Sequence, residues 1–131
     1  MNGYVIDLEK ETLKNEDFRR VLYTAKNCQL VLMSLLPQEE IGMEMHELDQ
    51  FIRFEKGNGL VVMDGDEHPV SDGYAVVIPA GTNHNVINMS ETETLKLYTV
   101  YSPPEHKDGV VRHTKEEALA NEEHFDGVTS E

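Results

Sequence analysis

Turn-forming residues recur at short intervals through the middle of this 131-residue chain, and their spacing limits the fold more than any other feature. Glycine and proline interrupt regular structure, and aspartate followed by glycine favours a tight turn. The segments between them are rich in valine, isoleucine, leucine, phenylalanine and tyrosine, which is typical of strands. The turn positions are Gly42, Gly57 with Gly59, Asp64–Gly65, Asp72–Gly73, Pro79 to Gly81 and Pro103–Pro104.

The apolar segments between these turns predict an all-β fold. Closely spaced short strands without long helical patterns between them are typical of a sandwich or a barrel. The expected strands are Gln29–Leu36, Met43–His46, Gln50–Glu55, Gly59–Met63, Ala75–Ile78, Asn85–Asn88 and Leu95–Ser102.

The two ends of the chain differ from this central region. Asn15–Leu22 mixes charged and apolar residues and predicts a short helix or an irregular cover. Thr114 to about Glu123 predicts a helix, with Thr114 as its N-cap and Glu117 as the capping-box partner. The length fits one domain. The predicted organisation is a single domain, 1–131, with a barrel core at about 29–104, an N-terminal cover at 1–28 and an acidic C-terminal helix and tail at 114–131.

The charge balance excludes some classes of partner. Eleven lysines and arginines stand against 25 aspartates and glutamates, giving a formal net charge of −14. Nucleic-acid phosphates need clustered basic residues, and anionic membranes attract them, so we expect neither partner. No apolar run approaches the roughly 20 residues of a transmembrane helix.

Two further features favour the cytoplasm. Residues 1–8 (MNGYVIDL) carry no visible signal peptide. The single cysteine, Cys28, cannot form an internal disulfide, as is usual in a reducing compartment. Because Cys28 lies beside the apolar run Leu30–Leu36, we expect it to be a small buried hydrophobic residue.

The stretch from Gly73 to Asn88 (GYAVVIPAGTNHNVIN) carries the strongest functional signal. It predicts a turn, a buried strand, a Pro–Gly corner and then His84 at the start of the next strand. Such a corner fixes the backbone, so that one imidazole projects to a defined point.

This spacing resembles the second motif of the cupin superfamily, G-x5-P-x-G-x2-H-x3-N, at every fixed position. The first cupin motif, G-x5-H-x-H-x3-4-E-x6-G, is matched in part by residues 38–57, where His46 and Gly57 agree. Three positions depart: Gln38, Glu44 and Gln50 replace the opening glycine, the first histidine and the glutamate. The resemblance implies a small double-stranded β-helix, or jelly-roll, barrel.

In cupins the motif residues commonly hold one divalent metal inside the barrel. The resemblance therefore implies a ligand set of Glu44, His46, Gln50 and His84. Glu44 and His46 are two apart, so both would face the same side of a strand. Two imidazoles, a carboxylate and an amide can bind a first-row divalent ion, and the metal (Zn, Mn, Fe or Ni) stays open.

A metal-free interpretation also stands. Buried Glu44, His46 and His84 can hydrogen-bond to one another as a neutralised polar cluster, either vestigial or functional. Such a pocket can still transfer protons, with Glu44 as the base and a histidine as its partner.

Two functions from different classes follow. One is a metal-dependent enzyme acting on a small polar metabolite, with isomerase or oxygenase chemistry and Glu44 as ligand or base. The other is a non-catalytic module that binds a small molecule without metal. The chain also looks like small bacterial cupins of the mannose-6-phosphate isomerase-like type. However, Arg53 and Lys96 are the only basic residues on the strands expected around the cavity, which is a poor phosphate clamp.

The remaining aromatic and ionisable residues have simpler interpretations. Tyr98 and Tyr101 lie at opposite parity on one strand, so at most one faces the cavity. Among the other histidines, His106 follows the last strand and can approach the barrel rim. The others are expected on the surface, namely His68, His113 and His124.

Three large apolar residues are expected on the outer face of the barrel. Met43 and Met45 alternate with Glu44 and His46, and Phe51 shares their outward parity. Exposed apolar groups of this size need cover, either from the N-terminal segment or from a second subunit. We expect a homodimer.

Overall fold

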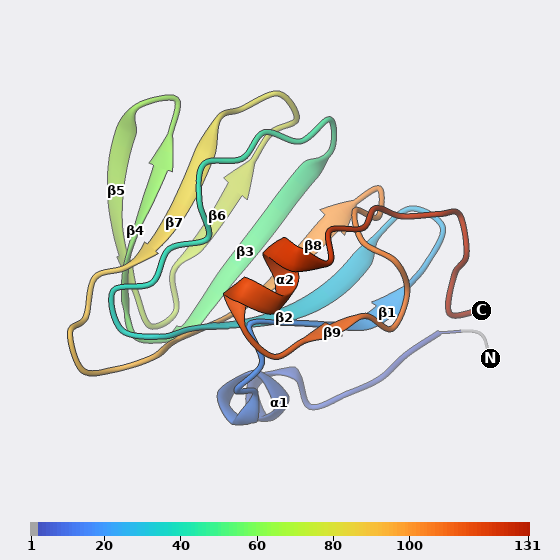
Figure 1. The fold of residues 1–131 in the computed structure, drawn as a ribbon, viewed down its shortest axis with the longest axis horizontal. Coiled ribbons are helices and arrows are strands. Elements are labelled where there is room, and N and C mark those ends of the chain that lie inside the picture. The colour runs from blue at the N-terminus through green and yellow to red at the C-terminus, as the bar shows by residue number, and fades with distance from the viewer. Residues whose placement is uncertain (1–2) are drawn as a thin grey trace.

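A computed structural model describes residues 3–131, and it consists mainly of two antiparallel β-sheets with short helices at either end of the chain (Figure 1). The expectation of an all-β jelly-roll fold with a short C-terminal helix is confirmed. In chain order the elements are α1 (Leu8–Lys14), β1 (Arg19–Thr24), β2 (Gln29–Leu35), β3 (Asp49–Lys56), β4 (Asn58–Met63), β5 (Asp66–Ser71), β6 (Ala75–Ile78), β7 (His84–Asn88), β8 (Leu95–Ser102), β9 (Val111–Arg112) and α2 (Lys115–Ala120).

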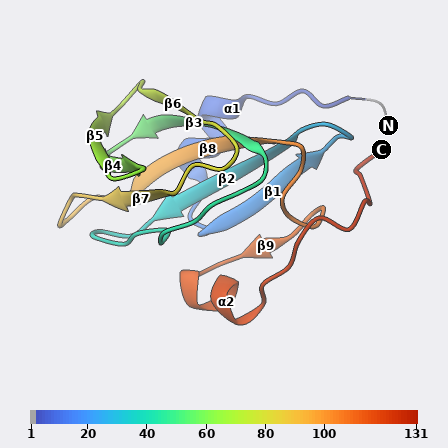
Figure 2. The same ribbon diagram turned by 90° about the horizontal axis from the view of Figure 1, so that it is seen from above.

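The two sheets differ in size. One has six strands in the order β6-β3-β8-β2-β1-β9, and the other has three in the order β5-β4-β7. The crossing order places strands far apart in sequence side by side, such as β2 beside β8 and β3 beside β8. Figure 2 shows α1 and α2 on opposite sides of the larger sheet.

Alternation along β3 shows how the sequence builds the core. Ile52 and Phe54 are fully buried between the sheets, whereas Phe51 and Arg53 lie on the outer face and are half-buried. This period of two is what a sheet with one face on a core requires. Gln50 has the parity of Ile52, so it also lies on the inner face and is buried.

The structure corrects three local predictions. Met43–His46 is not a strand, because its backbone pairs with β7 only at Glu44. Cys28 is exposed rather than buried, because it lies in the turn where the N–H of Ala25 donates to its carbonyl. Asn15–Leu22 is neither a helix nor an irregular cover throughout, since β1 begins at Arg19 and the helix α1 lies before it.

Strand β1 adds to the larger sheet from within the first 28 residues. It pairs with β2 on one side and with β9 on the other. Its burial alternates only weakly and its sequence, RRVLYT, opens with two charged residues, so the strand is hard to recognise from the sequence. The same holds for the polar β5 and the two-residue β9.

The C-terminal helix begins as predicted. The N–H of Glu117 donates to the Thr114 hydroxyl over 3.1 Å, which caps the first turn of α2. Beyond the helix, the N–H of Phe125 donates to the carbonyl of Glu105, and the N–H of Ser130 donates to that of Thr24. The tail therefore runs back along the larger sheet.

A buried lysine joins α1 to the outer face of the larger sheet. The Lys96 ammonium donates to the Asn15 carbonyl and to the Ser34 hydroxyl. Burial lowers the pKa of Lys96. The first residues of the chain thus cover part of the outer face, yet Met43 and Met45 stay largely exposed. Between residues 3 and 131, no helix has the length and apolar character needed to cross a membrane.

Candidate metal centre and the pocket beside it

The Pro–Gly corner before β7 fixes the position of His84. The N–H of Ala80 donates to the Asp49 carboxylate over 2.9 Å, and the N–H of Gly81 donates to the His46 carbonyl over 2.8 Å. Gly81 has a φ of +84°, a conformation that glycine adopts readily. The corner therefore holds the chain before His84 against the segment that carries His46.

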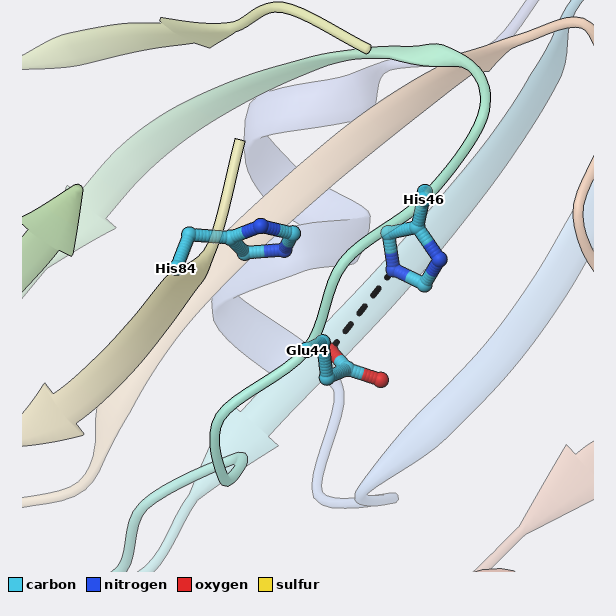
Figure 3. A group of neighbouring side chains, drawn as sticks. All are labelled: Glu44, His46 and His84. Atoms are coloured by element: carbon cyan, nitrogen blue, oxygen red, sulfur yellow. Dashed lines mark ion pairs between the residues drawn. The ribbon is translucent and has the colours of Figure 1, made fainter. Parts of the chain in front are cut away.

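Glu44, His46 and His84 meet in one cluster, and their side chains point toward one another (Figure 3). Each offers a possible ligand atom, and these atoms all lie within 4.8 Å of one another. A carboxylate oxygen of Glu44 lies 3.8 Å from Nε2 of His46. Three of the four residues predicted as metal ligands are thus brought together from two separate segments.

His84 is held in one orientation and one tautomer. Its Nδ1 lies 2.9 Å from the carbonyl of Thr82. Because a carbonyl only accepts, Nδ1 carries the proton and Nε2 keeps its lone pair. That Nε2 is buried and has no hydrogen-bond partner. An imidazole anchored through one nitrogen in this way is typical of metal-binding histidines.

Gln50, the fourth predicted ligand, lies on the inner face of β3. Its amide nitrogen donates to the Thr99 hydroxyl over 3.1 Å, which leaves the buried amide oxygen without a partner. In the sheet Gln50 stands opposite Tyr101, whose ring meets the His46 ring at 5.9 Å between centroids. The free oxygen therefore lies on the same inner face as the cluster.

His46 lies between two carboxylates. Its Nε2 faces Glu44, and its Nδ1 lies 3.6 Å from a carboxylate oxygen of Glu105. Burial alone would lower the pKa of His46, but the two carboxylates outweigh it, and the pKa is raised. Nε2 of His46 is buried and has no hydrogen-bond partner. Glu105 was not among the predicted site residues.

Aromatic rings continue from the cluster to His106. The ring of Tyr101 packs edge-on against His46 and, at 5.2 Å, against His106. Both ring nitrogens of His106 are buried without partners. Burial, with the nearby charges of Arg19 and His46, lowers the pKa of His106 to about 2, so its imidazole is neutral. Tyr101 faces inward while Tyr98 packs on Phe51 outside, as parity predicts.

A pocket of about 120 Å³ opens beside the cluster. Its walls come from the start of β1, the segment before β3, the chain leaving β8, and α2. Among the lining residues are Arg19, Glu44, Glu105, His106 and Ala118. The sequence pointed to His106 through its place after the last strand, but it gave no signal for Arg19, because β1 was not recognised as a strand. His68, His113 and His124 are exposed, as expected.

The comparison with protein families agrees with this architecture. The family model described as "Cupin domain" matches residues 31–101, which include every candidate ligand. The chain belongs to the cupin family. The cupin assignment made from the two motifs is thereby confirmed.

This cupin has similar relatives in a virus and in bacteria. It is 47% identical over 112 residues to protein L612 of Acanthamoeba polyphaga mimivirus, covering 82% of this chain and 70% of that one. It is 44% identical over 127 residues to YrkC of Bacillus subtilis, covering 92% and 68% of the two chains. The crystal structure of BH2720 from Bacillus halodurans superimposes with a TM-score of 0.89 at 45% identity, covering 92% and 96%.

Proposed function

We propose that this cupin holds one divalent transition metal through Glu44, His46, Gln50 and His84, and binds a small polar metabolite in the adjoining pocket. One observation carries the proposal. Three buried side-chain atoms, Nε2 of His46, Nε2 of His84 and the amide oxygen of Gln50, have no hydrogen-bond partner.

Such atoms are costly unless something binds them. A buried polar atom left unpaired costs about 1–3 kcal/mol. Nε2 of His84 has a free lone pair, and the amide oxygen of Gln50 can only accept. Because no donor faces either atom, a cation is the partner that suits both. With the Glu44 carboxylate they offer two nitrogen and two oxygen donors, which are ligand types that Zn, Mn, Fe or Ni accept.

A metal bound there would supply a Lewis acid that polarises an oxygen of the ligand. The chain's own residues then have separable roles. The Glu44 side chain, about one-third exposed at the pocket wall, can hold or accept a proton from a ligand. Thr82 fixes the His84 ring, and Glu105 faces the outer nitrogen of His46.

The donor set and the pocket volume suggest a reaction class and a size of ligand. Isomerisation of a small polar molecule suits zinc or manganese, and dioxygen-dependent oxidation suits iron. The pocket takes only a small molecule, because its volume is about 120 Å³. We place the activity in the cytoplasm, in keeping with a single cysteine that has no disulfide partner in the chain.

Elemental analysis of protein purified without a metal-affinity tag or chelator tests the proposal. We expect close to one equivalent of a transition metal in the parent and in His68→Ala, whose histidine is exposed on β5. His46→Ala should lose it. Metal absent from the parent even after reloading, or retained in His46→Ala, would overturn the proposal and favour a metal-free binding module.

A further inference from the structure

Arg19 is the one arginine of this chain without a carboxylate partner, and all four arginines lie within the described residues 3–131. Arg20 pairs with Asp17 at 3.4 Å. The other two pairs are Arg53 with Glu55 at 3.5 Å and Arg112 with Glu123 at 2.8 Å. Arg19 forms no such pair, and its buried Nε has no hydrogen-bond partner. In a chain of net charge −14, an unpaired guanidinium is unexpected.

Arg19 lies where a ligand can reach it. It opens β1 with its side chain toward the pocket, whereas its neighbour Arg20 points to solvent from the other face. The guanidinium carbon lies 5.5 Å from the centre of the Phe18 ring, which supports it from one side. The planar fork of donors is thus pre-oriented and free to bind a carboxylate through two hydrogen bonds.

The electrostatics place Arg19 close to the reactive cluster. Its positive charge adds to the effect of burial in lowering the pKa of His106, and it partly offsets the carboxylates that raise the pKa of His46. A second cation, Lys115 of α2, also lines the pocket. Four carboxylates line it too, those of Glu44, Glu105, Glu122 and Glu123. Because acidic groups outnumber the two cations, the pocket suits a ligand with a single negative charge, placed at Arg19, better than the two charges of a phosphate monoester.

The volume of the pocket and the polar groups of His106 limit the class of ligand further. A cavity of about 120 Å³ encloses only a small molecule or one end of a larger one, so the enclosed part of the ligand is short. His106, which is neutral, offers one ring N–H donor and one lone pair. These groups match a hydroxyl or a carbonyl oxygen next to a carboxylate.

We propose that the pocket selects a short hydroxy- or oxo-carboxylate, held through its carboxylate by Arg19 and directed toward Glu44 at its other end. This inference rests on the proposed function in placing the ligand beside the metal cluster. The contact with Arg19 itself needs no metal, so it is tested on metal-free protein.

The experiment is a titration of metal-free, ¹⁵N-labelled protein with glycolate, followed by NMR at constant ionic strength. The side-chain Nε–H signal of Arg19 should shift and saturate, together with the backbone amides of Glu105 and His106. Arg19→Gln should bind glycolate at least about tenfold more weakly, because a charge-assisted pair is lost. Arg20→Gln removes the same charge from the adjacent residue and should bind like the parent.

Arg19→Lys keeps the positive charge but loses the planar fork of donors, so its affinity for glycolate should lie between those of the parent and Arg19→Gln. This graded result separates an effect on binding from an effect on folding. Equal loss in Arg19→Gln and Arg20→Gln, or no saturable shift in the parent, would overturn the proposal. Phosphate binding more tightly than glycolate would overturn the carboxylate assignment. Since metal is absent from this titration, a failed metal analysis leaves its result intact, and the reverse also holds.

Discussion

Glu44 and His84 are joined through their backbones: the N–H of each donates to the carbonyl of the other, both over 2.8 Å. A second bridge pairs Glu40 with Ile87 farther along β7, where the N–H of Ile41 donates to the Val86 carbonyl and the N–H of Asn88 donates to that of Glu39. The segment before β3 is thus attached to β7 without forming a strand. A carboxylate from a loop gains a fixed position beside a strand histidine, which a metal or proton-transfer site requires.

Gln50 offers the sharpest test of the ligand set. Gln50→Leu keeps the size but removes the free amide oxygen, so divalent-metal affinity should fall at least about tenfold. Gln50→Glu supplies a carboxylate instead and should bind more tightly than the parent, because a charged oxygen attracts the cation more strongly. Competition with a fluorescent chelator measures both. Identical affinities in the three proteins would remove Gln50 from the ligand set.

Gln29 should be essential for the pocket wall. Its buried side chain donates to Thr24 and to the His106 carbonyl, and accepts from the N–H groups of Glu105 and His106. Gln29→Leu leaves these groups unpaired and should lower the free energy of unfolding by about 3 kcal/mol. Urea denaturation measures the loss. An unchanged midpoint would show that water replaces the side chain at no cost.

His106 predicts a dependence of stability on acid. Its pKa is about 2 in the folded protein against an ordinary value of 6.5, so between these values the unfolded chain binds a proton that the folded chain does not. Stability should therefore fall as pH decreases below about 6.5, by at most about 1.4 kcal/mol per pH unit.

Replacing His106 by asparagine should remove this contribution. Urea denaturation of the metal-free proteins between pH 6.5 and about 5 should give a shallower loss in His106→Asn than in the parent. His68→Asn removes an exposed histidine and should follow the parent. Parallel curves for the parent and His106→Asn would contradict the prediction.

Two glycines with positive φ should respond differently to substitution. A Cβ at Gly57 would lie 2.9 Å from Cδ1 of Leu95 and 3.0 Å from the Thr94 carbonyl oxygen, and its φ is +121°. Gly81 has a φ of +84° with no atom within 4 Å of a Cβ. Gly81→Ala should cost about 1 kcal/mol of unfolding free energy and Gly57→Ala about 3 or more. Thermal denaturation should rank them; the reverse order would contradict the structure.

The outer face of the larger sheet predicts self-association. Phe51 packs on Tyr98 with ring centres 6.4 Å apart, and Val77 of the neighbouring strand is 64% exposed. We expect a homodimer through this face. Light scattering should give twice the chain mass for the parent and a single chain mass for Phe51→Glu. Val128→Glu, which changes an exposed residue of the tail, should keep the mass of the dimer. A monomeric parent would show that this face stays open to water.

The part of the site that the sequence predicted is the part fixed by local geometry. His84 follows a Pro–Gly corner whose conformation is determined by the residues of the corner itself, so the direction of the His84 side chain could be predicted. Glu44 and His46 also face inward as predicted, although the alternation that suggested a strand has only one bridge to β7. Both side chains nevertheless converge on His84.

The rest depended on contacts between distant segments. Arg19 faces the pocket only because β1 is held between β2 and β9. No residue near Arg19 predicts this strand pairing. His106 is buried because Gln29, 77 residues earlier, holds its backbone. For Cys28 the prediction of burial was wrong, because the buried strand beside it starts only after the turn that contains Cys28.

The order of these parts along the chain has an evolutionary consequence. The residues of the Glu44–His46–His84 cluster lie before β8, whereas α2 and the segment from Glu105 to His124 supply much of the pocket wall. Mutations in that later stretch can alter which molecule fits while leaving the core strands and the cluster untouched. Descendants of one such two-sheet fold can therefore diverge in ligand choice while they keep the same folded core.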